Sequence, residues 1–231
     1  QSHAIRRLVS ENQLTCNDLM LPLFIAEGTK VKEPIEAMPG CFRLSLDLLQ
    51  KELKAIADLG IKAVLLFVKV DDALKDNKGT EAVNPEGLMQ KAIRKVKSIT
   101  PQIVVMTDVA LDPYSSHGHD GIVEDAKILN DSTVEVLSKM ALSHALAGAD
   151  FVAPSDMMDG RVLRIRTELD QAGFTDTGIM SYSAKYASSL YGPFREETNS
   201  GSSLREKCGG IQRCSSLRSR RGDLMSERSS T

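Results

Sequence analysis

The sequence predicts an α/β fold in which parallel strands alternate with helices, and three observations carry this prediction. Five short apolar segments are typical of buried strands, and the segments between them repeat apolar residues with a helical period. Strand centres fall roughly 30 to 45 residues apart, which suits crossover connections in a parallel sheet. Five such units favour an α/β barrel or a doubly wound sheet. Three of the predicted helices end at a glycine that is soon followed by an apolar strand: Gly60, Gly148 and Gly173.

The first two units follow this plan. A strand is expected at 21–25, followed by a helix that Ser45 caps. The second strand, at 63–68, is apolar throughout and is therefore expected to be buried on both faces. Asn84, followed by a proline, caps its helix. The apolar stripes of these two helices are Leu46, Leu49, Leu53 and Ile56 in the first, and Met89, Ala92, Ile93 and Val96 in the second.

The remaining units contain three further strands, at 103–106, 151–153 and 179–182. Asp131 is expected to cap the helix after the first of these strands. The apolar stripes are Val134, Leu137, Ala141 and Ala145 in that helix, and Val162, Ile165 and Leu169 in the next.

We expect one α/β domain over residues 1–195 and a different segment over 196–231. The chain has 231 residues, of which 42% are hydrophobic, so it can bury a sizeable core. Beyond residue 195, serine and arginine are frequent and large apolar residues are scattered, which predicts a flexible, solvated tail. The product of a reading-frame slip and an RNA-binding arginine tail are the alternatives, and the second lacks interleaved aromatic residues.

Composition argues against several partners and sites. A formal net charge of −2 gives no reason to expect nucleic acid or an anionic membrane as a partner. No apolar run approaches the roughly 18 residues that a spanning helix needs. The four cysteines show no CxxC spacing, which argues against structural zinc and against a disulfide framework. No basic-then-apolar leader opens the sequence, so we expect a cytoplasmic protein.

The first of three polar clusters follows the third strand, at the strand end where active sites lie in both architectures. It contains Asp108, Asp112, Asp120, His117 and His119. These side chains could bind substrate or a metal ion. Alternatively, the aspartates start turns and the histidines are loop residues held by hydrogen bonds.

The other two clusters follow the fourth and fifth strands. Ser155 and Asp156 either line the site or simply cap the next helix. Lys185 follows the last strand among tyrosines, where desolvation and the like charge of Arg195 would favour the neutral amine, which can add to a carbonyl. Alternatively, Lys185 is an exposed loop lysine that lies over the tyrosines. Arg195 suits a carboxylate, so the clusters together point to carbonyl chemistry on a carboxylated substrate.

These clusters, in this order, resemble the porphobilinogen synthase family, also called delta-aminolevulinic acid dehydratase. The longest matching stretches are DVALDPYSSHGHDGIV, AGADFVAPSDMMDGRV and GIMSYSAKYASSLYGPFR. The resemblance implies a TIM-type (β/α) barrel, of which this chain contains about five of the eight strand-helix units. It implies a homo-oligomer, usually an octamer assembled through an N-terminal arm. It also implies a lyase reaction in tetrapyrrole (heme) biosynthesis, in which two 5-aminolevulinate molecules condense to porphobilinogen with loss of two waters.

The resemblance also implies roles for single residues. Lys185 and Asp108 match catalytic positions, and the residues expected to bind substrate are Arg195, Ser155, Asp112, Asp120 and Tyr182. Where one class of the family has three cysteines that bind catalytic zinc, this chain has Ala110, Asp112 and Asp120. It therefore resembles the aspartate-rich class without that zinc. Asp112 and Asp120 are expected to hold the substrate amino group or a magnesium ion, since carboxylates suit hard cations.

The chain departs from the family after Arg195. The VKP-type motif with the lysine that forms the principal Schiff base does not occur, and Lys207 is the only lysine after Lys185. Five of eight strands cannot close a barrel, and they leave open sheet edges. The alternative to an active enzyme is therefore an inactive truncated remnant. A lysine-dependent aldolase on the same kind of barrel is a further reading.

Overall fold

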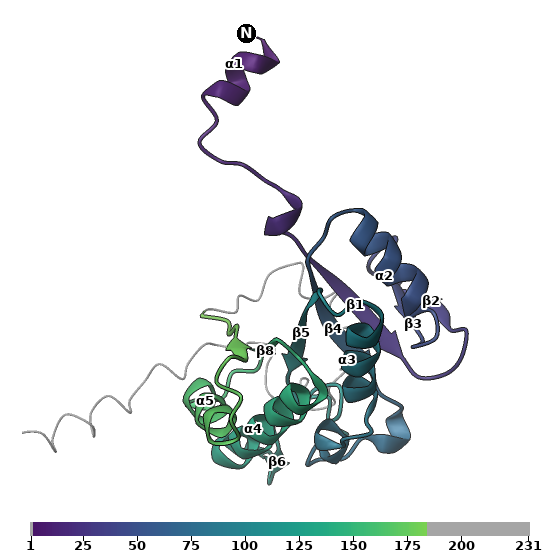
Figure 1. The fold of residues 1–231 in the computed structure, drawn as a ribbon. Helices are drawn as coiled ribbons and strands as arrows, with labels where there is room; N and C mark the ends of the chain where they lie inside the picture. The colour runs from purple at the N-terminus through teal and green to yellow at the C-terminus, as the bar shows by residue number, and fades with distance from the viewer. Residues whose placement is uncertain (1, 184–231) are drawn as a thin grey trace, which may run out of the picture.

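Five parallel strands, neighbours in chain order, form most of one sheet in the computed structural model, which describes residues 2–183 (Figure 1). Each of these strands pairs in parallel with the next. The prediction of an α/β fold with a parallel sheet is therefore confirmed. The last strand has two residues where we predicted four. The five strands are β1 (Met20–Ala26), β4 (Ala63–Lys69), β5 (Val104–Val109), β8 (Phe151–Pro154) and β9 (Gly178–Ile179).

Two short strands that we did not predict extend the sheet beyond β1. β3 (Phe42–Leu44) pairs in parallel with β1, and β2 (Lys32–Pro34) pairs antiparallel with β3. A separate hairpin of β6 (Val123–Glu124) and β7 (Lys127–Ile128) follows β5. Within the described residues, β2 and β9 are therefore the two edges of the seven-stranded sheet.

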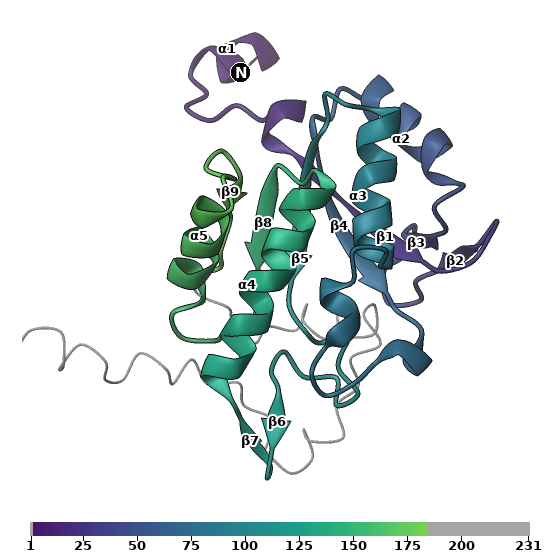
Figure 2. The ribbon, with the colours of Figure 1, turned by 60° about the horizontal axis from the view of Figure 1, so that its bottom comes forward.

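Four helices lie side by side on one face of the sheet (Figure 2). They are α2 (Leu49–Asp58), α3 (Leu88–Ile99), α4 (Asn130–Ala147) and α5 (Arg161–Gln171). Alternate strand residues such as Leu66 and Val105 join the core under these helices. On the opposite face, the rings of Phe24 and Phe67 stack with centroids 5.5 Å apart. The predicted stripes of the helices are largely buried, although Val162 is 42% exposed.

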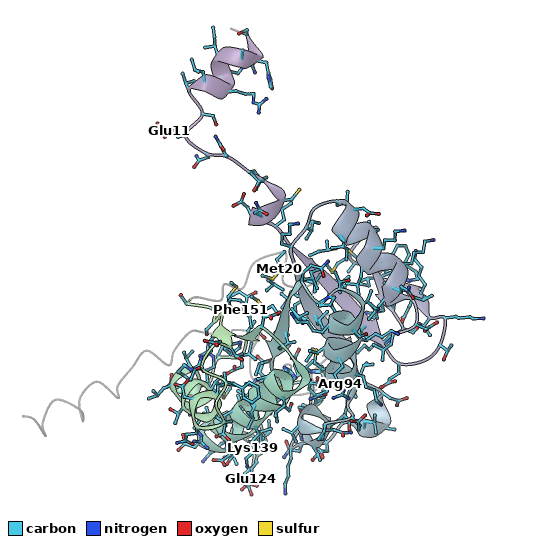
Figure 3. The ribbon with its side chains drawn as sticks, in the orientation of Figure 1. Glu11, Met20, Arg94, Glu124, Lys139 and Phe151 are labelled. Atoms are coloured by element: carbon cyan, nitrogen blue, oxygen red, sulfur yellow. The ribbon has the colours of Figure 1, made fainter. Side chains whose placement is uncertain are left out.

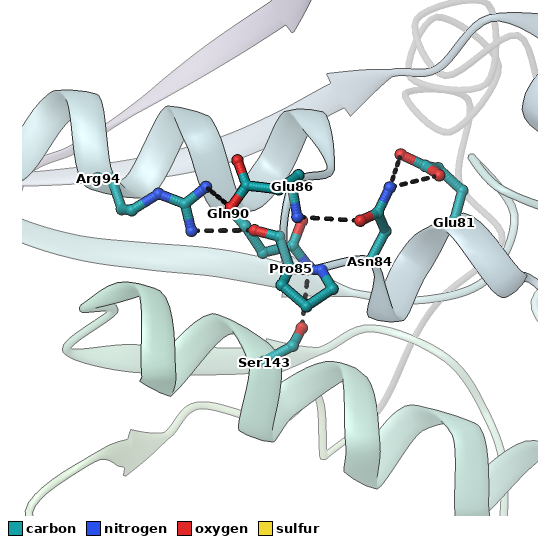
Figure 4. Close-up of polar contacts among 7 residues, drawn as sticks. All are labelled: Glu81, Asn84, Pro85, Glu86, Gln90, Arg94 and Ser143. Atoms are coloured by element: carbon teal, nitrogen blue, oxygen red, sulfur yellow. Dashed lines mark hydrogen bonds and ion pairs between the residues drawn. The ribbon is translucent and has the colours of Figure 1, made fainter.

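Three predicted helix caps are wrong. The Ser45 hydroxyl accepts from the Val31 amide (2.9 Å), and α2 begins only at Leu49. Asn84 accepts from the Glu86 amide (2.9 Å), and α3 begins at Leu88 (Figure 4). The Ser45 side chain therefore bonds to the backbone just before β2, and the Asn84 side chain bonds within a turn that precedes α3.

The third wrong cap is Asp131, which lies inside α4, because that helix begins one residue earlier. The helix ends are confirmed: all three glycines predicted to end helices have positive φ, with values of 80° for Gly60, 104° for Gly148 and 85° for Gly173. In Figure 4, Gln90 of α3 also donates to the Ser143 hydroxyl (2.9 Å), which ties α3 to α4.

The N-terminal residues extend away from the sheet as an arm (Figure 1). The arm contains α1 (His3–Leu8) and a 3-10 turn, Cys16–Asp18, and Glu11 between them is labelled in Figure 3. Its large apolar residues are exposed: Ile5, Leu8, Val9 and Leu14. Two further 3-10 turns, Asp72–Leu74 and Thr80–Val83, follow β4. None of the helices in residues 2–183 combines the length and apolar composition of a membrane span.

Candidate active site

Polar residues collect at the carboxyl ends of the parallel strands. Figure 3 shows Met20 and Phe151, at the starts of β1 and β8, on one side of the molecule and Glu124, beyond the end of β5, on the other. The candidate residues that follow β5 and β8 therefore lie at the end of the sheet where α/β folds bind substrates.

Asp108 and Ser155 lie at the ends of the adjacent strands β5 and β8. Asp108 is buried and pairs in register with Ala153. The Ser155 amide donates to the Val109 carbonyl (3.3 Å), so Ser155 continues the ladder one step further. The side chain of Thr107 contacts α4, and because side chains alternate along a strand, Asp108 faces away from the helices.

The aspartate loop, defined as residues 110–121, is held by the segment that follows β4. The Asp76 amide donates to the Tyr114 carbonyl and the Ser116 amide donates to the Asp76 carbonyl, both at 3.1 Å. Asn77 donates to the Val123 carbonyl (2.8 Å) and accepts from the Val123 amide (3.1 Å). The chain on both sides of Asp120 therefore takes its position from the neighbouring strand end.

The histidines of the loop make local contacts. Nδ1 of His119 accepts from the Gly121 amide (3.0 Å), and the His117 amide donates to the Ser115 hydroxyl (3.1 Å). The imidazole of His119 is therefore held by a hydrogen bond within the loop, whereas the His117 bond uses its backbone amide.

Tyr114 connects the aspartate loop to the end of β5, and our sequence analysis did not single it out. Its hydroxyl is buried and has no hydrogen-bond partner. Burial raises the pKa of this phenol, and the carboxylates of Asp108, Glu81 and Asp112 raise it further. The phenol therefore stays protonated, and Asp108 and Asp112 both lie near it.

Asp156 is buried at the end of β8 and does not cap α5, so that alternative is wrong for Asp156. One carboxylate oxygen accepts from the Met158 amide (2.7 Å), while α5 begins at Arg161 after Gly160, without a side-chain cap. The same helix start shows that Ser155 does not cap it either. Burial raises the pKa of Asp156 to about 7, against the opposing effects of Arg161 and the Met158 amide, and the Asp120 charge adds to the increase. Asp120 of the aspartate loop therefore lies close to the end of β8.

Arg161 links the ends of β8 and β9, a role that its sequence context did not reveal. Its Nε lies 3.3 Å from Oδ2 of Asp156, in an ionic contact without hydrogen-bond alignment. Its Nη1 donates to the Met158 carbonyl (2.9 Å) and its Nη2 to the Ser181 hydroxyl (3.3 Å). The only sequence signal was a charged residue at a predicted helix start.

The structure thus brings Asp108, Asp112, Asp120 and Ser155 to one end of the sheet. Tyr182, just after β9, is 58% exposed. Lys185, Arg195 and the predicted tail at 196–231 lie outside the described residues.

Metal ligands were tested on the same residues. Within residues 2–183, no group of three histidine, cysteine, aspartate or glutamate side chains converges as a metal site. Asp112 and Asp120 are oxygen donors, which suit magnesium better than zinc, but with their described neighbours they do not complete a site.

Comparison with known proteins gives one consistent family. The sequence model of delta-aminolevulinic acid dehydratase matches residues 1–213, a range that continues past the predicted start of the tail. A delta-aminolevulinic acid dehydratase of Bradyrhizobium diazoefficiens is 51% identical over 199 residues, covering 86% of this chain and 56% of that protein. The chloroplastic one of Hordeum vulgare is 54% identical over 210 residues, covering 90% of this chain and 49% of that protein.

A solved structure agrees with these relatives. The crystal structure of delta-aminolevulinic acid dehydratase from Toxoplasma gondii ME49, in complex with the reaction product porphobilinogen, has a TM-score of 0.85 and 49% identity. The match covers 91% of this chain and 58% of that one. This chain therefore spans about half the length of these proteins, between 49% and 58%.

Proposed function

The chain belongs to the delta-aminolevulinic acid dehydratase family, and from this premise we propose that it serves the condensation of two 5-aminolevulinate molecules to porphobilinogen. The observation that most directly supports the proposal is the placement of Asp108 and Ser155 at the ends of adjacent strands, with Asp120 close to Asp156 at the same end of the sheet. A buried carboxylate next to a hydroxyl can orient a substrate that has both an amine and a carbonyl.

We assign the covalent and binding roles as follows. The neutral amine of Lys185 attacks the carbonyl carbon of a substrate, a nitrogen–carbon bond forms, and the carbonyl oxygen leaves as water with both amine protons. Asp108 orients that substrate, and Arg195 binds its carboxylate through two parallel hydrogen bonds. Ser155 and Tyr182 line the substrate, and Asp112 and Asp120 pair with its amino group.

Asp112 and Asp120 are also the residues we propose for magnesium. Bound there, the ion would supply positive charge through oxygen ligands.

We further propose that the chain forms homo-oligomers, octamers in the fully assembled state, through its arm. The exposed apolar side chains of Leu8 and Leu14 are 86% and 79% accessible, and they would be covered by a second copy. Sedimentation velocity of the chain and of a Leu8→Ser, Leu14→Ser variant tests this, and equal masses for the two would contradict it.

A cytoplasmic location is also proposed, because Cys16 and Cys41 are free thiols.

The experiment that tests the main proposal is formation of porphobilinogen from 5-aminolevulinate by this polypeptide. Lys185→Ala should abolish the product. The matched control is Lys139→Ala, because Lys139 is an exposed lysine of α4 whose ammonium pairs with Glu135 (3.2 Å) on the same helix.

Borohydride reduction in the presence of 5-aminolevulinate provides a second readout. It converts an imine into a stable amine, so a covalent adduct on Lys185 would count against the inactive remnant. Absence of both product and adduct would contradict the proposal and favour the inactive remnant. An aldol product in place of a pyrrole would favour the aldolase.

A further inference from the structure

The strand β9 has two residues and, among the described residues, pairs with β8 alone. At its two ends, the Gly178 amide donates to the Asp150 carbonyl (2.9 Å) and the Met180 amide, just after the strand, donates to the Val152 carbonyl (3.0 Å). The chain that follows contains Ser181 and, four residues later in the sequence, Lys185. Side-chain contacts from α5 add to this backbone pairing at both ends of β9.

Two arginines of α5 supply such contacts, one at each end of β9. At the entering end, Arg166 donates to the carbonyls of Thr177 (2.7 Å) and Phe174 (2.8 Å). At the leaving end, Arg161 donates to the Ser181 hydroxyl (3.3 Å). Side chains of α5 therefore contact the chain just before and just after β9.

Arg161 differs from Arg166 because its other contacts reach the site. It also binds the Met158 carbonyl and contacts the buried Asp156, which lies near Asp120. The Arg161 side chain is only 16% exposed. One guanidinium thus joins the end of β8 to the end of β9.

Helix stability does not explain an arginine at this position. Arg161 is the first residue of α5, where a positive charge opposes the helix dipole. The N-cap, Gly160, supplies no side-chain hydrogen bond that would offset this cost. An arginine at position 161 is therefore favoured by the contacts that its guanidinium makes with the ends of β8 and β9.

We propose that Arg161 is a positioning residue, which sets the end of β9 against the end of β8 through Ser181, Met158 and Asp156. The effect of Arg161 on catalysis would act through the segment that leads to Lys185. That part of the inference rests on the proposed function. A planar guanidinium can reach three partners in different directions, which a lysine ammonium on a flexible stem cannot reproduce.

Amide hydrogen exchange of the whole chain tests the positioning without reference to activity. Arg161→Lys keeps the charge and should speed exchange in the peptide over 178–183 by about tenfold or more, because hydrogen bonds from a charged donor are lost. Ser181→Ala, which removes one of the contacts, should give a smaller increase. The control is Arg164→Lys on the same helix, whose guanidinium pairs with Glu168 (3.1 Å) at the surface, and it should match the parent chain.

Unchanged exchange over 178–183 in Arg161→Lys would overturn the inference. An equal increase throughout α3 and α4 would also overturn it, because that result indicates global destabilisation.

Steady-state kinetics then test the consequence for catalysis. A misplaced reacting group lowers kcat, so Arg161→Lys should reduce kcat by about tenfold or more with KM within about twofold of the parent. An increase in KM alone would make Arg161 a substrate-binding group and overturn the assignment. If the parent chain forms no porphobilinogen, the proposed function fails, while the exchange result still decides whether Arg161 positions β9.

Discussion

The imidazole Nδ1 of His144 lies 3.0 Å from the hydroxyl oxygen of Thr107, which joins α4 to the strand that ends in Asp108. Both residues are fully buried. Thr107 faces the helices and Asp108, the next residue, faces the opposite side of the sheet. The helix layer is therefore tied to the back of the candidate site by one polar contact inside an apolar core.

The burial of His144 makes stability depend on acid pH. Burial lowers the pKa of His144 to about 3, so the folded protein keeps the imidazole neutral, whereas the unfolded chain takes up a proton near the ordinary histidine pKa of 6.5. Between these values the unfolded state binds more protons. The free energy of unfolding should therefore fall as the pH falls, by up to about 1.4 kcal/mol per pH unit from this group.

Urea unfolding of the parent chain and of His144→Gln at pH 7 and pH 4.5 measures the effect. The advantage of the parent over the variant should shrink at the lower pH, since glutamine does not titrate. A difference between the two proteins that is the same at both pH values would contradict the prediction.

Asp156 should show the opposite dependence. Its pKa is raised by burial to about 7, while the unfolded chain loses the proton near 3.8. Between these values the folded state binds more protons, so this group's contribution to stability is present at low pH and is lost as the pH rises towards 7.

The variant Asp156→Asn should accordingly gain stability relative to the parent between pH 4.5 and pH 7.5 in urea unfolding. Asp159→Asn, an exposed carboxylate on the same loop, is the control. The prediction fails if Asp156→Asn loses stability relative to the parent over this range.

Asn77 should be needed for the order of the chain around the aspartate loop. Asn77→Ala removes both side-chain hydrogen bonds to Val123, which should cost about 1–3 kcal/mol of unfolding free energy. Amide exchange should increase most over 118–124. Asn12→Ala, on the exposed arm, serves as the comparison, and an equal effect of both substitutions would rule out the role assigned to Asn77.

Gly178 should tolerate no side chain while Phe151 is present. A Cβ at Gly178 would overlap the Phe151 ring of the adjacent strand. Gly178→Ala should destabilise the protein by about 1–3 kcal/mol, as overpacking does. In a double-mutant cycle, Phe151→Leu should recover much of this loss. Strict additivity of the two changes in thermal or urea unfolding would show that the ring is not the obstacle.

The buried faces of the helices were predictable from the sequence, because burial of one helix face requires apolar residues at a regular spacing. The stripe of Met89, Ala92, Ile93 and Val96 in α3 is buried as predicted, since one face of an amphipathic helix must cover the sheet. Helix starts were less predictable. Ser45 is a good cap by type, yet its hydroxyl bonds to Val31, fourteen residues earlier, which the local sequence cannot indicate.

The amino-acid sequence by itself determined the alternation of strands and helices, the glycine helix ends and the polar clusters after the strands. These features depend on periodicity and on residue type, which are local. Only the tertiary structure decided that Asp120 lies near Asp156, and that Arg161 reaches both Asp156 and Ser181. Residues far apart along the chain meet only because parallel pairing of β5, β8 and β9 brings their carboxyl ends to one end of the sheet.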